Sequence, residues 1–76
     1  MKISELKKGD IAKIIKYEGS EKTYRNKLLA MGLTPGATFQ LVRIAPLGDP
    51  VEIKLRGFSL VLRKKESQAL VVEKSL

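Results

Sequence analysis

The sequence predicts a small, mostly β domain: an SH3-like barrel of five short strands, with one helix between strands 1 and 2. The first observation is length, because 76 residues make a single domain, here residues 1–76. The second is the spacing of glycine, proline and acidic turn residues between short apolar segments. The third is that an open five-stranded sheet would leave long edges and an apolar face that a single helix cannot cover. A barrel solves both problems.

The first strand is expected at residues 11–17, a run that is rich in isoleucine. Before it, Ile3 and Leu6 are the core candidates of the N-terminal segment. Within it, Ile14 and Ile15 place apolar side chains on both faces, because successive side chains of a strand point to opposite sides. The strand is therefore expected to be either buried on both faces or bulged.

The helix is expected from Ser20 to about Met31. Ser20 is a good N-cap, and Glu21 lies in the first turn, where the helix dipole favours an acidic side chain. Tyr24, Leu28 and Met31 follow at the i, i+4 and i+7 positions. This spacing predicts one apolar stripe that faces the core.

A built corner at residues 32–36 should turn the chain from the helix into the sheet. Gly32 is the natural residue after the helix end, and Pro35 prevents continuation of the helix. The apolar phase changes after Leu41, as in a strongly bent strand. The later segments are expected as strands at 37–44, 51–55, 58–62 and 70–73, with a polar turn at 64–68. Phe58, Leu60 and Leu62 alternate along the strand at 58–62, which places their side chains on one face.

The net charge of +7 raises the question of nucleic-acid binding. Residues 1–27 hold eight Lys/Arg and four Asp/Glu, and residues 28–76 hold seven and four, so the excess is spread along the chain. Nucleic-acid arms concentrate their charge, and single-strand binders add stacking aromatics, which are scattered here. The favoured interpretation is a basic, soluble surface without nucleic acid. The alternative is a small nucleic-acid-binding β-barrel, since residues 7–11 faintly resemble ribosomal and elongation-factor barrels.

Catalysis and cofactor binding are not expected. The chain has no Cys and no His, which excludes disulfides, thiolate or imidazole metal sites, and Cys/His or Ser-His-Asp catalysis. It has no glycine-rich phosphate loop either. The hard oxygen ligands Asp49, Glu52 and Glu66 suit Mg²⁺ or Ca²⁺ better than Fe²⁺, and Asp49, between Gly48 and Pro50, is favoured as a turn residue. No metal site is therefore predicted. The apolar runs are too short to cross a membrane and no signal peptide is visible, so a cytoplasmic protein is expected.

Three blocks of the sequence resemble one known family. YRNKLLAMGLTPG at 24–36, VRIAPLGDPVEI at 42–53 and RGFSLVLRKKE at 56–66 are similar, in order and spacing, to the signatures of the ferrous-iron transport protein A (FeoA) family. The resemblance covers about residues 3–74. It implies a stand-alone SH3-like barrel that assists ferrous-iron uptake by docking on the cytoplasmic, GTPase-containing region of the membrane transporter, ferrous-iron transport protein B. It further implies contact with the membrane only through that partner. Weak self-association is left open.

Two groups of residues are the candidates for partner binding. On the helix, Leu29 lies about 100° from Leu28, so it is expected to be exposed, with Lys22 and Arg25 as a basic rim. In the hairpin of residues 43–56, charged side chains either form cross-strand ion pairs or meet a partner. The hairpin candidates are Arg43, Asp49, Glu52 and Arg56. Arg43, Arg56 and Arg63 are all expected at strand positions.

Overall fold

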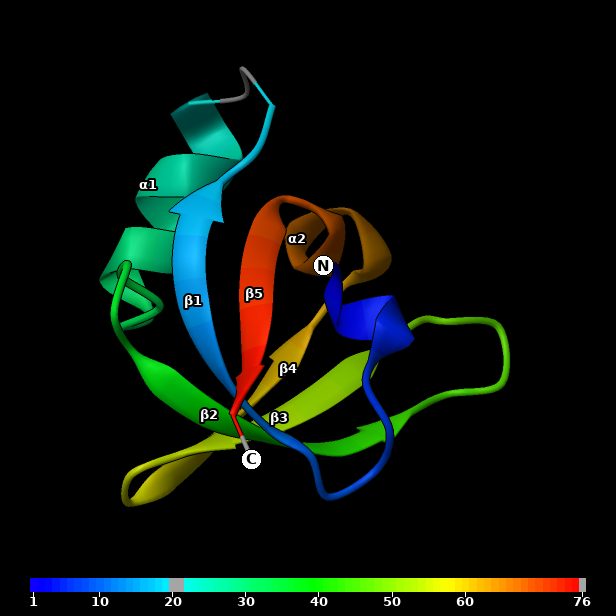
Figure 1. The fold of residues 1–76 in the computed structure, drawn as a ribbon. Coiled ribbons are helices and arrows are strands. Elements are labelled where there is room, and N and C mark those ends of the chain that lie inside the picture. The colour runs from blue at the N-terminus through cyan, green and yellow to red at the C-terminus, as the bar shows by residue number, and fades with distance from the viewer. Residues whose placement is uncertain (20–21, 76) are drawn as a thin grey trace.

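The computed structural model describes residues 1–19 and 22–75 and confirms a mostly β fold (Figure 1). The predicted helix cap at Ser20 and Glu21 lies outside the described residues. In chain order the elements are η1, a 3-10 helix (Ile3–Glu5), β1 (Ile11–Tyr17), α1 (Lys22–Ala30), β2 (Thr38–Ile44), β3 (Val51–Leu55), β4 (Phe58–Leu62), α2 (Lys64–Gln68) and β5 (Leu70–Ser75).

The five strands form one antiparallel sheet in the order β4-β3-β2-β1-β5. The sheet curls into the expected barrel shape, with α1 on the outside beside β1 (Figure 1). Strands β4 and β5 are the two ends of the ladder, and among residues 1–19 and 22–75 no backbone pairing joins them. The chain itself spans this seam, because α2 connects β4 to β5.

Both irregular strands contain a register shift: of the two alternatives expected for β1 the bulged one is present, and β2, expected to be bent, is also irregular. Along the β1–β5 pairing the register shifts between Ile14 and Lys16. This shift leaves Ile14 buried and turns Ile15 outward, where 41% of its surface is exposed. A second register shift, between Leu41 and Arg43, bends β2 against β3. The extra residue at each bulge increases local twist, which helps a short sheet to curl.

The corner after α1 is a Schellman motif. The Leu33 N–H donates to the Leu28 carbonyl at 2.9 Å, and the Gly32 N–H donates to the Leu29 carbonyl at 3.0 Å. Gly32 adopts φ +84°, which a residue without a side chain accommodates without strain. Leu33 and Leu28 are both fully buried, which is the apolar contact that accompanies this motif. The sequence pattern predicts Leu33 only as part of the corner, so its complete burial is a finding of the structure.

The core lies inside the curled sheet and extends under η1 and the corner. Its largest fully buried side chains come from β1, β2, β3, β4, β5, α1, η1 and the corner. They include Ile3, Ile14, Leu28, Leu33, Phe39, Leu41, Ile53, Leu62, Leu70 and Val72. Leu6 is buried as well, so both N-terminal candidates are core residues. Tyr24 and Met31 are only partly buried, so Leu28 is the fully buried member of the predicted helical stripe.

Three expectations about the C-terminal half need correction. Residues 64–68 form helix α2 and not a polar turn. The last strand continues beyond residue 73 to Ser75, because Ser75 pairs with Ile11 of β1. Phe58, expected to alternate inward, is 48% exposed because it lies at the start of edge strand β4.

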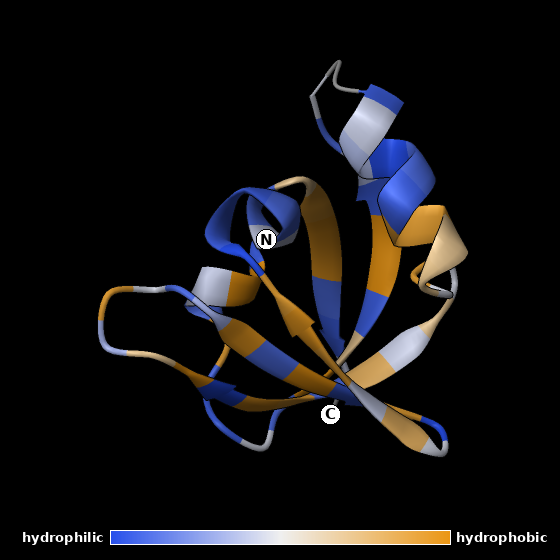
Figure 2. Cartoon of the chain, turned by 180° about the vertical axis from the view of Figure 1, so that it is seen from behind, coloured by the Kyte–Doolittle hydropathy of each residue, from blue (hydrophilic) through white to orange (hydrophobic). Residues whose placement is uncertain are grey.

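Helix α2 forms because carboxylates satisfy the free N–H groups at its start. Glu66 Oε1 accepts the Arg63 N–H at 2.8 Å, and Asp49 Oδ1 accepts the Lys64 N–H at 3.2 Å. The helix is hydrophilic along its length, in contrast to the alternating strands (Figure 2). The segment has no apolar residues whose spacing could indicate a helix, so the sequence pattern does not predict α2.

Candidate partner-binding surface

The candidate residues on α1 share one exposed face. Lys22, Arg25 and Leu29 are spaced by three and four residues, which places them in one row along a helix. All three are exposed, with Leu29 at 43%, whereas the neighbouring Leu28 is fully buried. We call Lys22, Arg25 and Leu29 the α1 stripe. The predicted exposure of Leu29 is confirmed.

The charged candidates of the 43–56 hairpin do not form one surface. Arg43 lies opposite Glu52 in the β2–β3 register, and its Nε is 3.1 Å from Glu52 Oε1. This is the cross-strand ion pair of the simpler interpretation. Asp49 points elsewhere, toward Arg63, whose Nη2 lies 3.1 Å from Asp49 Oδ2. Its contacts thus tie the loop of residues 45–50 to the start of α2.

Two arginines do not occupy the strand positions expected of them. Arg56 lies in the turn between β3 and β4, because β3 ends at Leu55. Arg63 follows the end of β4 and precedes α2, where its N–H is bound by Glu66. The prediction failed because the alternation of apolar and charged residues continues beyond the strands. At Arg56 it runs into the two-residue turn after β3, and at Arg63 it runs past the end of β4.

The three carboxylates considered for metal binding are each engaged with a different cation. Asp49 pairs with Arg63, Glu52 with Arg43, and Glu66 with Lys27. Within residues 1–19 and 22–75, no group of three or more His, Cys, Asp or Glu side chains is placed to hold a metal ion. Asp49, Glu52 and Glu66 are therefore held apart, each by its own cation.

Glu66 links the two helices through a buried charge. Its side chain is 4% exposed, and Oε2 lies 2.5 Å from Lys27 Nζ of α1. Burial alone would raise the pKa of Glu66, but hydrogen bonds from Lys27 and the Arg63 N–H, together with the charges of both residues, outweigh it. The pKa of this carboxyl therefore lies below its ordinary value, and Glu66 is ionised at neutral pH.

A groove runs between α1 and α2. One cavity of about 360 Å³ is lined by residues from the end of β1, from α1 and from α2. A second cavity, of about 480 Å³, adjoins the start of α2. Tyr24 and Lys65 line both cavities, so we treat them as two parts of one feature, the α1–α2 groove. Besides these two residues, the groove is lined chiefly by Tyr17, Arg25, Leu28, Gln68 and Ala69 in the first part, and by Lys27, Arg63, Lys64 and Glu66 in the second.

Tyr17 fixes the inner end of the groove. Its hydroxyl donates a hydrogen bond to the Leu33 carbonyl at 2.6 Å, which ties the end of β1 to the corner after α1. Burial raises the pKa of Tyr17, and the nearby positive charge of Arg25 opposes this increase. Tyr17 therefore stays protonated at neutral pH, and its hydroxyl remains a donor.

The sequence reasoning did not place Tyr17, Lys65 or Gln68 in a site. Lys65 and Gln68 both fall in the segment 64–68, which the sequence pattern predicts as a polar turn. One signal could have indicated a helix start there: Glu66 follows Arg63 by three residues, the spacing of an acidic side chain that reaches back to cap a helix.

The fold and these surfaces define the structural class of the protein. It is a small SH3-like β-barrel that presents the α1 stripe and the α1–α2 groove on its outside. None of the described helices is long and apolar enough to cross a membrane. The family model for the FeoA domain matches residues 1–74. The chain therefore belongs to the FeoA family, as the resemblance of its three sequence blocks indicated.

Relatives and solved structures agree with this assignment. The Fe(2+) transport protein A/Fe(2+) transporter FeoB fusion protein of Porphyromonas gingivalis is 37% identical over 73 residues, which is 96% of this chain but only 8% of that protein. A FeoA protein from Chlorobium tepidum is 38% identical with a TM-score of 0.81, over 97% of this chain and 70% of that one. A Stenotrophomonas maltophilia FeoA, described as a prokaryotic SH3 domain protein in complex with zinc, is 22% identical over 96% of this chain and 89% of that one. With a TM-score of 0.79, it shares the fold.

Proposed function

We propose that this protein is an accessory factor of ferrous-iron uptake in the cytoplasm, without catalytic activity of its own. In this proposal it docks on the cytoplasmic, GTPase-containing region of the ferrous-iron transporter, and it reaches the membrane only through that partner. One observation carries the proposal: the Porphyromonas gingivalis relative joins a transport protein A segment to the transporter FeoB in one chain. Fusion holds two proteins at high effective concentration, which benefits partners that act together.

The α1 stripe is the proposed docking face. The inward side chains of the barrel strands are committed to the core, whereas α1 lies on the outside and fully buries only Leu28 (Figure 2). Leu29 then supplies an apolar anchor, with Lys22 and Arg25 as its charged rim. An apolar centre with a polar rim is the usual anatomy of an interface. The hairpin candidates Arg43 and Glu52 already neutralise each other.

A binding assay with a matched pair of variants tests this proposal. Leu29→Glu changes the stripe, and Leu47→Glu makes the same change at a leucine that is 86% exposed on the loop of residues 45–50. We expect Leu29→Glu to weaken capture of the purified cytoplasmic region by about tenfold or more, and to reduce iron uptake in cells, because it buries an unpaired charge. Leu47→Glu should bind like the parent protein.

Two results would count against the proposal at different levels. If the folded Leu29→Glu variant binds and supports uptake like the parent, the docking face lies elsewhere, and Arg43, Asp49, Glu52 and Arg56 are tested next. If the parent protein does not bind the transporter region at all, the docking itself is wrong. An electrophoretic mobility assay at physiological salt addresses the nucleic-acid alternative, which predicts tight binding that weakens steeply with added salt.

A further inference from the structure

We propose that the α1–α2 groove binds an acidic, extended segment of the partner protein that carries one bulky apolar side chain. The proposal rests on the proposed function and adds a second contact, which adjoins the α1 stripe at Arg25. Leu29 does not line the groove, whereas Arg25 borders both the groove and the α1 stripe. A partner that binds both the α1 stripe and the α1–α2 groove would contact α1 at two adjoining surfaces.

The charge of the groove favours an acidic ligand. Five cationic side chains line it, and two of them are already paired: Lys27 with Glu66, and Arg63 with Asp49. Arg25, Lys64 and Lys65 form no ion pair within residues 1–19 and 22–75. Three acidic residues line the groove: Asp49 and Glu66, which form these two pairs, and Glu18. Glu18 is neutralised by Lys2, whose Nζ lies 2.7 Å from Glu18 Oε1. The positive charge that remains is therefore available to a ligand.

The floor of the first cavity favours an apolar anchor. It combines the aromatic side chains of Tyr17 and Tyr24 with Ala69, above the fully buried Leu28. Its volume of about 360 Å³ is within the range of ligand pockets. A bulky side chain buried there would gain hydrophobic free energy, while carboxylates of the same segment meet Arg25 and Lys65 at the rim.

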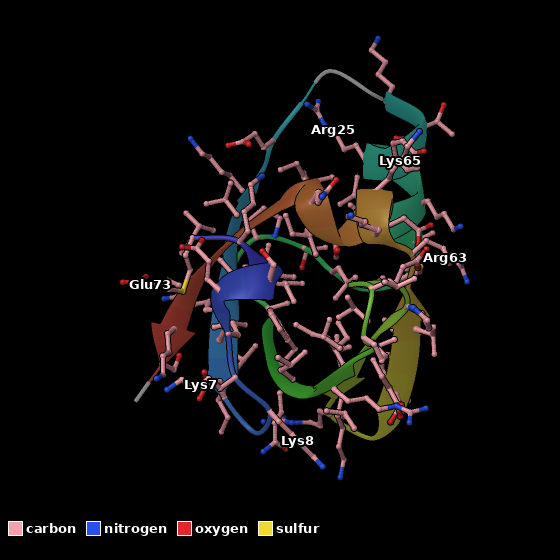
Figure 3. The ribbon with its side chains drawn as sticks, turned by 90° about the vertical axis from the view of Figure 1, so that its right-hand side faces the viewer. Lys7, Lys8, Arg25, Arg63, Lys65 and Glu73 are labelled. Atoms are coloured by element: carbon pink, nitrogen blue, oxygen red, sulfur yellow. The ribbon has the colours of Figure 1, made fainter. Side chains whose placement is uncertain are left out.

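The distribution of basic residues favours a peptide over a nucleic acid. Figure 3 places Arg25, Lys65 and Arg63 beside the two helices, whereas Lys7 and Lys8 lie at the opposite end of the molecule. Phosphate backbones are bound by basic residues gathered on one face or in one stripe. Here the charge at the groove is local and surrounds an apolar floor, which suits a short acidic segment with a single anchor.

The test uses two glutamate-rich probe peptides that are identical except that one carries a central Phe and the other a Ser. We expect the Phe peptide to shift the backbone amide NMR signals of Arg25, Lys65 and Gln68 in the isotope-labelled protein, and the Ser peptide to bind more weakly. The double variant Arg25→Glu/Lys65→Glu should weaken binding by about tenfold or more, since two attractive contacts become repulsive.

The matched control is Lys7→Glu/Lys8→Glu, which makes the same change in net charge at the opposite end of the molecule (Figure 3). It should leave binding within about twofold of the parent, because charges beyond a Debye length of about 8 Å are screened at physiological salt. Equal loss in both double variants, or equal affinity for both peptides, would overturn the proposal, because binding would then depend on net charge alone. Displacement of the Phe peptide by GTP or RNA at lower concentration would reassign the groove to a phosphate ligand.

Repeating the measurement with the transporter's cytoplasmic region separates this proposal from the function on which it rests. If Leu29→Glu weakens that binding and Lys65→Glu, which changes a groove residue outside the α1 stripe, does not, the function stands and the groove is wrong. If the parent protein binds the Phe peptide in the groove but not the transporter region, the groove stands as an acidic-peptide site and the partner is a different protein.

Discussion

Replacing each of two adjacent leucines of α1 by alanine should change stability to very different extents. Leu28 is fully buried and Leu29 is 43% exposed, so Leu28→Ala removes core contacts and Leu29→Ala removes a surface side chain. Leu28→Ala should cost about 2–5 kcal/mol of unfolding free energy, through lost burial and the cavity left behind. Leu29→Ala should cost within about 0.5 kcal/mol, as surface substitutions do.

The size of the domain makes this difference easy to measure. At roughly 0.05–0.15 kcal/mol per residue, a domain of this length has about 4–11 kcal/mol of total stability. Each kcal/mol lowers the melting temperature by roughly 4–8 °C in a domain of this size. Leu28→Ala should therefore lower the melting temperature by at least about 8 °C, and Leu29→Ala by only a few degrees.

Urea and thermal denaturation, followed by circular dichroism, give both values for both variants. The Schellman contact between Leu28 and Leu33 predicts in addition that Leu33→Ala destabilises the domain to a similar degree, although Leu33 is outside the helix. If Leu29→Ala is as destabilising as Leu28→Ala, then α1 buries a different face. The docking face proposed for α1 would then be wrong as well.

Three further outcomes are expected. Glu66 has a pKa below its ordinary value in the folded protein, so its charge stabilises the fold above about pH 4.5, and this contribution is lost as the pH falls through the lowered value. In urea titrations at a series of acidic pH values, the free energy of unfolding of Glu66→Gln should therefore depend less on pH than that of the parent protein. An unchanged pH dependence would contradict the role of the pair with Lys27. Gly36→Ala should cost about 1–2 kcal/mol, because Gly36 adopts φ +94° while its N–H donates to the Ile14 carbonyl at 2.7 Å; a parental melting temperature would refute this reasoning. Anaerobic calorimetry with Fe²⁺ should show at most weak, non-stoichiometric heat, and a stoichiometric site of micromolar affinity would instead indicate ligands such as Asp49 or Glu52 shared between chains.

The strands could be predicted because their residues carry the pattern of the sheet. Alternation defined β3, and the consecutive apolar residues Ile14 and Ile15 indicated either a strand buried on both faces or the bulge that the structure contains. Leu33 was missed because its burial depends on the three-dimensional path of the corner, while its neighbours in sequence are turn residues. Helix α2 was missed because the carboxylate of Asp49, 15 residues away from Lys64, contributes to its start.

The candidate surface could be predicted only in part, for a related reason. The α1 stripe is local, so helical spacing was enough to identify Lys22, Arg25 and Leu29 as neighbours. The groove combines Tyr17, Arg25 and Lys65, which come from three different elements. Their proximity follows from where α2 packs in the fold, and the spacing of residues along the chain does not specify that position.

The seam between β4 and β5 has a consequence for how this domain opens. Elsewhere around the sheet, separating neighbouring strands breaks a row of backbone hydrogen bonds. At the seam, among residues 1–19 and 22–75, α2 and the packing of core side chains connect the two outer strands, without backbone pairing between them. Local fluctuations follow the route that breaks the fewest interactions, so amide hydrogens of α2 should exchange with solvent long before those of β1, which is paired on both sides. A partner bound between α1 and α2 would slow the exchange of the α2 amide hydrogens. By restricting motion at the seam, it would also reduce the conformational freedom of the barrel as a whole.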